Sequence, residues 1–202
     1  MASPTRYTTL AGPSRHESER VKGSRFVADL APVADEAAAE AFVAGVREAF
    51  PDASHHVFAW ILDPEGRRTR ASDDGEPGGS SGPPVLRQLE GHGVTGAVCV
   101  VTRWFGGTKL GVGGLMRAYG GCAGEALDRA ELVEVRVTRG RALAFPYEVS
   151  GAIEAVARAC EATPGDASYG AEVEARFTVP LERLDEFDRE VVERTAGRAR
   201  LL

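Results

Sequence analysis

The spacing of apolar residues along the chain predicts an alternation of strands and helices. Apolar residues that recur every three or four positions predict amphipathic helices, and alternating or continuous apolar runs predict strands. The clearest helix spans residues 35–50, where Ala39, Val43 and Val46 share one face and Pro51 follows the end. Residues 95–104 form the clearest buried strand, because its middle is an unbroken apolar run.

The expected elements form two groups. The first comprises an irregular arm or short edge strand over 1–18, strands over 24–33, 55–62, 67–71, 95–104 and 132–140, and helices over 35–50, 85–92 and 114–130. This order fits a layered α+β domain. The second group has the order βαββαβ, with strands over 141–145, around 167–179 and over 198–202, and helices over 148–161 and 181–195. That order is typical of a ferredoxin-like domain, so we expect two domains, 1–139 and 140–202.

Composition narrows the class of protein. The chain of 202 residues is 43% hydrophobic and 27% charged, as in globular proteins in water. Its apolar runs are too short to cross a membrane, and no signal peptide opens it. The net charge of −6 argues against a protein that attracts nucleic acid over its whole surface. Three scattered cysteines without a CxxC pair indicate reduced thiols, and hence a cytoplasmic protein.

Residues 72–121 hold most of the candidate chemistry. An acidic segment, residues 73–76, carries Asp73, Asp74 and Glu76. A glycine segment, residues 106–114, joins the strand 95–104 to the helix 114–130. Cations lie in and around it, and no acid occurs between 95 and 121. Because the two segments have complementary charge, we expect them to converge in space.

The glycine segment favours binding of an anion. It matches neither a Walker P-loop nor GxGxxG, and the GxSxG match at Ser80 lacks the strand before it and the helix after it. A glycine-rich approach to a helix N-terminus nevertheless offers free N–H groups and a favourable dipole. The candidate contacts for phosphate are Arg103, Lys109 and Arg117, with Gly106, Gly107, Gly111, Gly113 and Gly114 letting the backbone approach a ligand. Contact with a protein, and a purely structural role, remain alternatives.

The acidic segment and His55 are expected to support that site. Carboxylates at close spacing suit a divalent cation, but they also cap turns, and we expect Asp73, Asp74 and Glu76 to hold the basic segment in place. His55 and His56 begin a strand and so face opposite sides. An inward His55 near the acidic segment is expected to be hydrogen-bonded and structural. No metal or cofactor is assigned.

Four stretches of sequence resemble the YigZ/IMPACT family. They are VKGSRF (21–26), the histidine of DASHH (52–56), DDGEPGGSSGPPVL (73–86) and VTRWFGGTKLGVGGLMRAYG (101–120). Together they cover most of residues 15–130. Gly79-Ser80-Ser81 stands where the family usually has a Gly-Thr-Ala-like run, and Trp104 where tyrosine is common. Neither departure removes a charge, so the resemblance includes the whole candidate site.

The resemblance implies a fold and a link to translation. The first domain should have the ribosomal-protein-S5 domain-2-like fold. The second resembles the ferredoxin-like domains of elongation factor G that bacterial YigZ-type members carry. Eukaryotic relatives are non-catalytic regulators that compete for a ribosome-associated activator of a translation-stress kinase. Their partner-binding role does not transfer directly, because they carry a different additional domain.

These observations predict a non-enzymatic, cytoplasmic regulator that binds RNA or a ribosome-associated partner. Two alternatives remain open. One is an enzyme that acts on a phosphorylated or nucleotide-like substrate, with Asp73, Asp74 and Glu76 as metal ligands or base. The other is a module that only binds proteins. If the first hypothesis holds, exchanging Arg103 and Lys109 for glutamate should abolish binding and leave the fold intact. The sequence leaves the ligand and the oligomeric state undetermined.

Overall fold

The computed structural model describes residues 3–202, and contacts within the chain separate them into two units. The first unit comprises residues 7–135; the second comprises residues 136–202 together with Pro4–Arg6. The change of unit falls earlier than residue 139, where the sequence placed it. The strand expected over 132–140 is in fact two strands. β7 (Leu132–Arg136) pairs with β1 (Arg6–Leu10), and β8 (Thr138–Phe145) belongs to another sheet.

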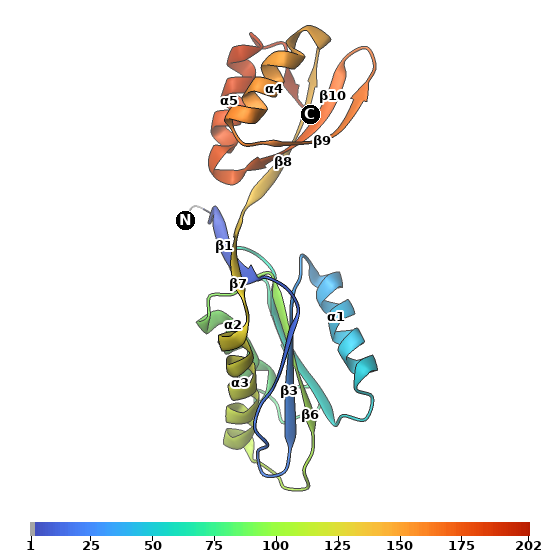
Figure 1. The fold of residues 1–202 in the computed structure, drawn as a ribbon, viewed down its shortest axis with the longest axis vertical. Coiled ribbons are helices and arrows are strands. Elements are labelled where there is room, and N and C mark those ends of the chain that lie inside the picture. The colour runs from blue at the N-terminus through green and yellow to red at the C-terminus, as the bar shows by residue number, and fades with distance from the viewer. Residues whose placement is uncertain (1–2) are drawn as a thin grey trace. The chain divides into compact units, whose positions relative to one another are not determined.

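The first unit is built on a five-stranded antiparallel sheet in the order β2-β3-β6-β4-β5 (Figure 1). Its strands are β2 (Ser14–Glu17), β3 (Arg25–Pro32), β4 (His55–Ile61), β5 (Thr69–Ser72) and β6 (Ala97–Trp104). The arm expected over 1–18 therefore contains β1 and the edge strand β2, while its first two residues lie outside the described part of the chain. β6 lies at the centre of the sheet, between β3 and β4.

Helices cover both faces of this sheet (Figure 1). They are α1 (Glu36–Ala49), α2 (Gly82–Gly91) and α3 (Val112–Arg129). Alternate residues of the central strands point to opposite faces. Val98 and Val100 of β6 pack with α1, whereas Cys99 and Val101 pack with α2 and α3. This parity also decides which face of the sheet receives each functional side chain at the strand ends.

The second unit has the element order βαββαβ. It consists of β8, α4 (Ser150–Ala159), β9 (Thr163–Tyr169), β10 (Val173–Pro180), α5 (Leu184–Arg194) and β11 (Arg200–Leu201), with short 3₁₀ turns before both helices. The sheet order is β11-β8-β10-β9, and its paired strands are antiparallel. Ile153, Val156 and Phe187 from the helices pack on Leu143 and Val179 in one core. The predicted α+β class with a ferredoxin-like second half is confirmed.

Two helices of the first unit begin earlier than the sequence predicts. α2 starts at Gly82 because Pro83 and Pro84 occupy its first turn, where the missing N–H groups would have no partner in any case. α3 starts at Val112, so the last three residues of the glycine segment already belong to it. Among residues 3–202, no helix combines the length and apolar character needed to cross a bilayer.

Candidate functional site

The candidate site lies where the central strands of the first unit end and α3 begins. In the sheet, Arg103 is the cross-strand neighbour of Phe26 on β3 and of His55 on β4. Because directly opposed residues point to the same face, all three side chains lie on the α2 and α3 side. Arg103 also continues the odd-numbered positions of β6 that face this core. The register of the sheet therefore buries Arg103, whose exposed fraction is only 3%.

A buried network joins Arg103 to the acidic segment. Arg103 Nη1 donates to Glu76 Oε1 over 2.5 Å, and the Tyr119 hydroxyl donates to the same oxygen over 2.7 Å. Arg103 Nη2 donates to Ser24 Oγ. Burial and the hydrogen bond to Glu76 raise the pKa of Tyr119 far above its usual value, so its hydroxyl stays protonated. The predicted convergence of the acidic and basic segments is confirmed at this pair.

The two aspartates of the acidic segment are also engaged within the chain. Asp73 accepts backbone N–H bonds from Gly79, Ser81 and Gly82 at 2.7–2.8 Å. Asp74 pairs with Arg47 of α1 and accepts the backbone N–H of His56. These contacts tie the turn before α2 to the sheet. Among residues 3–202, no three His, Cys, Asp or Glu side chains are grouped as a metal site requires.

His55 lies over the acidic segment, as the sequence suggested. Its Nδ1 is 2.8 Å from the backbone oxygen of Asp74, and because a carbonyl oxygen only accepts, Nδ1 carries the hydrogen. Its Nε2 lies 3.8 Å from Glu76 Oε1. His56 is buried on the opposite face, where Nε2 is 3.1 Å from the Phe50 carbonyl.

Replacing Asp73 by alanine is expected to lower the free energy of unfolding by about 2 kcal/mol at pH 7, because three backbone donors lose a charged acceptor. Burial acts to raise the pKa of Asp73, but the three N–H donors outweigh it and leave the pKa below its usual value. The stabilisation is therefore present above the unfolded-state pKa of about 3.9 and is lost as pH falls through the folded-state pKa.

Urea denaturation of wild type and Asp73→Ala between pH 7 and pH 3 checks this prediction. The two stabilities should converge at the acid end. Glu48→Ala on α1 is the control, since Glu48 is exposed and should change stability by no more than about 0.5 kcal/mol. A difference between Asp73→Ala and wild type that stays constant with pH would contradict the proposed role of the carboxylate.

The glycine segment contains glycines of two kinds. Gly106 and Gly114 are packed against the chain itself: a Cβ on Gly106 would lie 2.0 Å from the Gly23 carbonyl carbon, and one on Gly114 would lie 3.0 Å from Leu110 Cβ. In contrast, no heavy atom outside the chain neighbours would meet a Cβ on Gly107 or Gly111, and Gly113 would meet only the end of Arg117. Only these three of the five predicted glycines leave space for a ligand.

Three exposed cations surround the first turn of α3; we call Lys22, Lys109 and Arg117 the cation cluster. Lys22 and Gly23 form a tight turn with positive φ at both residues, and this turn packs against Gly106. Lys22, Arg117 and Gly114 line one hollow of about 200 Å³. Gly111 caps α3 without a side-chain hydrogen bond. Within residues 3–202, none of the three cations has an ion-pair or hydrogen-bond partner.

A cavity of about 380 Å³, which we call the α3 cavity, lies beside this cluster. Lys109 is on its rim, and it also contains residues of the acidic segment, the ends of β4 and β6, and the start of α3. The lining residues are His55, Glu76, Pro77, Arg103, Phe105, Lys109, Leu110, Gly111, Val112 and Leu115. The cavity thus joins the buried network to the exposed cations.

The structure changes the expected role of Arg103. The sequence grouped it with Lys109 and Arg117 as a phosphate contact on the surface. Its charge is instead neutralised by Glu76, and its side chain is 4% exposed. The sequence interpretation also missed Tyr119, Lys22 as part of the cluster, and Arg47 as the partner of Asp74. A Lys-Gly step in VKGSRF is a turn signal that could have marked Lys22 as exposed.

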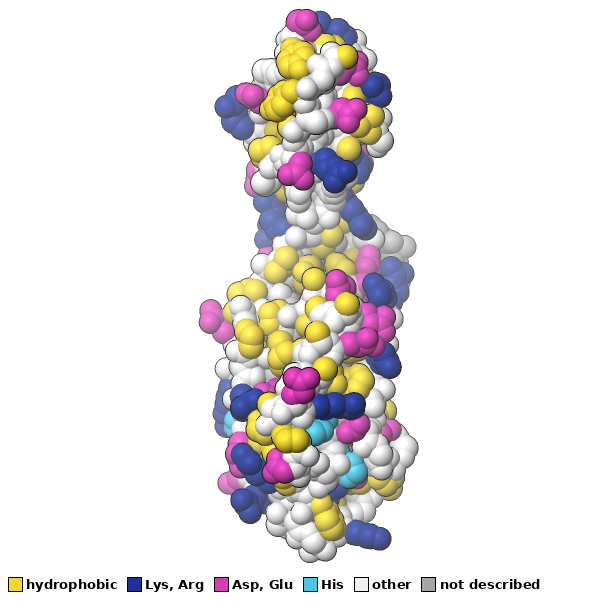
Figure 2. All heavy atoms as spheres, turned by 90° about the vertical axis from the view of Figure 1, so that its right-hand side faces the viewer, with side chains coloured by type: hydrophobic (Ala, Val, Ile, Leu, Met, Phe, Trp, Pro, Cys, Tyr) yellow, Lys and Arg dark blue, Asp and Glu magenta, His cyan; other side chains and the backbone are white. Residues whose placement is uncertain are grey.

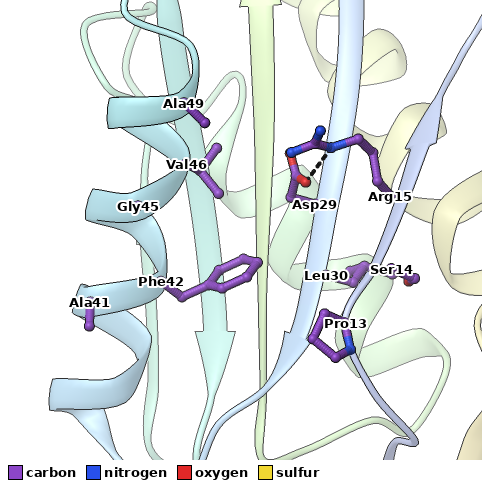
Figure 3. A pocket seen from close by; sticks show the side chains of 10 residues that line it. All are labelled: Pro13, Ser14, Arg15, Asp29, Leu30, Ala41, Phe42, Gly45, Val46 and Ala49. Carbon is purple, nitrogen blue, oxygen red and sulfur yellow. Dashed lines mark hydrogen bonds and ion pairs between the residues drawn. The ribbon is translucent and has the colours of Figure 1, made fainter.

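A larger hollow of about 560 Å³ lies on the opposite face of the sheet, between α1 and strands β2 and β3 (Figure 3). Phe42 and Val46 of α1 point into it, and Arg15 reaches across β2 to Asp29 (Figure 3). Burial raises the pKa of Asp29, although the pair with Arg15 opposes the shift. Apolar side chains dominate the lining of this groove, and none of the predicted site residues lies in it.

The surface over α1 carries both signs of charge. Figure 2 shows acidic and basic side chains interleaved over this side of the first unit. At the end where the glycine segment lies in Figure 1, the same view shows mostly backbone and uncharged atoms with basic but no acidic side chains at the tip. The charge imbalance is therefore local to the site.

Comparison with known proteins identifies both parts of the chain. Residues 22–127 match the Impact N-terminal domain, and residues 143–198 match a domain of unknown function, DUF1949. The chain is 37% identical to the IMPACT family member YigZ of Escherichia coli (strain K12), with 91% of each chain covered. It is 32% identical to the IMPACT family member YvyE of Bacillus subtilis (strain 168), over 96% of this chain and 88% of that one.

A solved structure supports the same relationship. It is described as the crystal structure of an hypothetical protein, and it superposes with a TM-score of 0.79 at 35% sequence identity. The match covers 98% of this chain and 97% of the other. The likeness therefore extends through both units.

Proposed function

The chain belongs to the IMPACT family, and from the geometry of its site we propose that it is a non-enzymatic, translation-associated regulator that binds RNA through the cation cluster. The contrast between the two charged segments carries this proposal. Asp73, Asp74 and Glu76 are all engaged inside the fold. Lys22, Lys109 and Arg117 are left exposed around an open helix N-terminus.

This arrangement suits a phosphate backbone. Cations without internal partners exchange condensed counterions for phosphates, which is the main source of affinity for nucleic acid. The first N–H groups of α3 and its dipole add to the attraction for an anion. Because Gly107, Gly111 and Gly113 carry no side chain, a phosphate can reach the main chain closely. The overall charge of −6 confines the attraction to this one end of the first unit.

The enzymatic alternative has less support. Metal ligation or base catalysis requires carboxylate lone pairs that are free, whereas those of Asp73 accept three backbone donors and Glu76 Oε1 accepts two side-chain donors. Nucleophilic thiols are also disfavoured, because burial raises the pKa of Cys99 and brings that of Cys122 to about 11. The carboxylates have the contacts of structural groups.

A protein-binding module is the second candidate. Phe105, Val112 and Met116 are large apolar residues with exposed fractions of 48%, 55% and 37%, and all three lie at the start of α3 or just before it. Exposed apolar residues close together are typical of binding surfaces. The resemblance to translation regulators supports a ribosome-associated target and a cytoplasmic location for either candidate.

Replacing Lys109 and Arg117 together by glutamate is expected to reduce the affinity for single-stranded RNA by at least about tenfold near physiological salt. Two phosphate contacts are lost and two repulsive charges are added. Stability should change by no more than about 0.5 kcal/mol per site, because both side chains are exposed and unpaired. Fluorescence anisotropy with a labelled RNA of mixed sequence measures the affinity, and the melting temperature checks the fold.

The matched control reverses two other exposed arginines, Arg87 and Arg158, which lie on α2 and α4. This variant has the same net charge as Lys109→Glu with Arg117→Glu, so any general effect of charge is equal in both. RNA binding should be retained by the control. If both variants bind RNA as wild type does, the cation cluster is not the contact surface.

A further inference from the structure

The α3 cavity has an aromatic wall that is held in place from behind. Phe105 follows β6, and its backbone N–H donates to Ser54 Oγ over 3.0 Å. The guanidinium carbon of Arg103 lies 5.3 Å from the centre of its ring. Since Arg103 is itself fixed by Glu76, the ring is supported by a rigid group, yet about half of its surface is exposed. An exposed, preorganised ring of this kind is a stacking platform.

The cavity also has polar groups on its buried side. His55, Glu76 and Arg103 all line it. Because Nδ1 of His55 carries its hydrogen, Nε2 of the neutral ring is an acceptor. Arg103 is buried, and among the described residues its Nε has no hydrogen-bond partner. An aromatic wall and these polar groups together match a flat ligand that has a π face and a polar edge.

The neighbouring charges indicate which ligand of that type fits. Lys109 is on the rim, and Val112, the first residue of α3, lines the same cavity. A volume of about 380 Å³ lies within the range of about 300–1,000 Å³ typical of small-molecule pockets. A nucleotide unit carries a flat base with donors and acceptors, and its phosphate follows within reach of a cation at the cavity rim.

We propose that the α3 cavity holds one unstacked nucleobase of a single RNA strand. The base stacks on Phe105, its edge faces His55 and Glu76, and the adjoining phosphate lies at Lys109 and the first turn of α3. This inference rests on the proposed RNA binding and adds to it a preference for single strands, since a base in a duplex is not free to enter. An apolar side chain of a protein would fill the cavity but leave its polar groups without partners.

The test compares two RNA oligomers of equal length and charge, one normal and one in which every base is replaced by an abasic site. Wild type is expected to bind the normal strand about tenfold more tightly, from stacking of one base. Phe105→Ala should bring the affinity for the normal strand down to that for the abasic strand and leave abasic binding unchanged. Phe105→Trp, which keeps an aromatic face, should retain the preference.

The outcomes separate this inference from the function on which it rests. If wild type binds both strands equally, and both are released by Lys109→Glu with Arg117→Glu, the backbone contact stands and the base pocket is wrong. If Phe105→Ala weakens both strands equally, its role is structural and the base pocket is again wrong. If neither strand binds, RNA binding itself fails, and the inference fails with it.

Discussion

Replacing Arg103 by methionine is expected to lower the free energy of unfolding of the first unit by about 3–5 kcal/mol. Removing one member of a buried ion pair leaves the other charge in a low-dielectric environment without compensation. The Glu76 side chain is 6% exposed, and it would keep only the Tyr119 hydroxyl as a strong donor. Urea denaturation followed by tryptophan fluorescence measures this unit, because Trp60 and Trp104, the two tryptophans of the chain, lie in β4 and β6.

The double variant Arg103→Met with Glu76→Leu separates the pair from other effects of the substitution. Apolar residues of similar volume often replace a buried pair at little cost, so the double variant should recover at least half of the lost stability. If Arg103→Met alone costs less than about 1 kcal/mol, the network does not hold the site together. The prediction also corrects the expectation that glutamate at this position would leave the fold intact: it would add an acid beside Glu76 in a buried site.

Replacing Gly106 by alanine is expected to destabilise the first unit by about 3 kcal/mol or more. A Cβ at this position would lie 2.0 Å from the Gly23 carbonyl carbon and 2.3 Å from the Ser24 nitrogen. Both are backbone atoms, so the Lys22 turn and the glycine segment have to separate, and strain of this kind is among the mechanisms that give large effects. The same urea titration measures the loss.

Gly121→Ala provides the matched control. Gly121 lies in the middle of α3, is exposed, and would meet no atom within 4 Å if it carried a Cβ. In an open helical position alanine is better than glycine by about 0.5–1 kcal/mol, so this variant should be as stable as wild type or slightly more stable. A Gly106→Ala protein of normal stability would show that the Lys22 turn does not depend on this close contact.

The core of the first unit follows from apolar periodicity. The runs at 24–33, 55–62 and 95–104 predicted β3, β4 and β6 because these central strands are buried on both faces. The alternation over 132–140 was misleading for a physical reason. It continues through the point where the chain changes partner, from β1 to β10, and side-chain alternation does not depend on which strand lies alongside.

The site was only partly predictable. Complementary charge predicted that the acidic and basic segments meet, but charge alone does not say which cation is buried. Parity could have done so, since position 103 follows 97, 99 and 101 on the face of β6 that packs against α3. The contact of Lys22 with the site could not be predicted, because it depends on the packing of Gly23 against Gly106, far apart in sequence.

The salt dependence of RNA affinity tests the central claim most directly. If Lys22, Lys109 and Arg117 each neutralise one phosphate of a single strand, the slope of log affinity against log salt concentration should be about −2, at about 0.7 per contact. The Lys109→Glu and Arg117→Glu double variant should flatten it to about −0.7 or abolish binding, whereas the Arg87→Glu and Arg158→Glu control should keep the wild-type slope. A wild-type slope near zero, or a slope that the double variant does not change, would contradict RNA binding by the cation cluster.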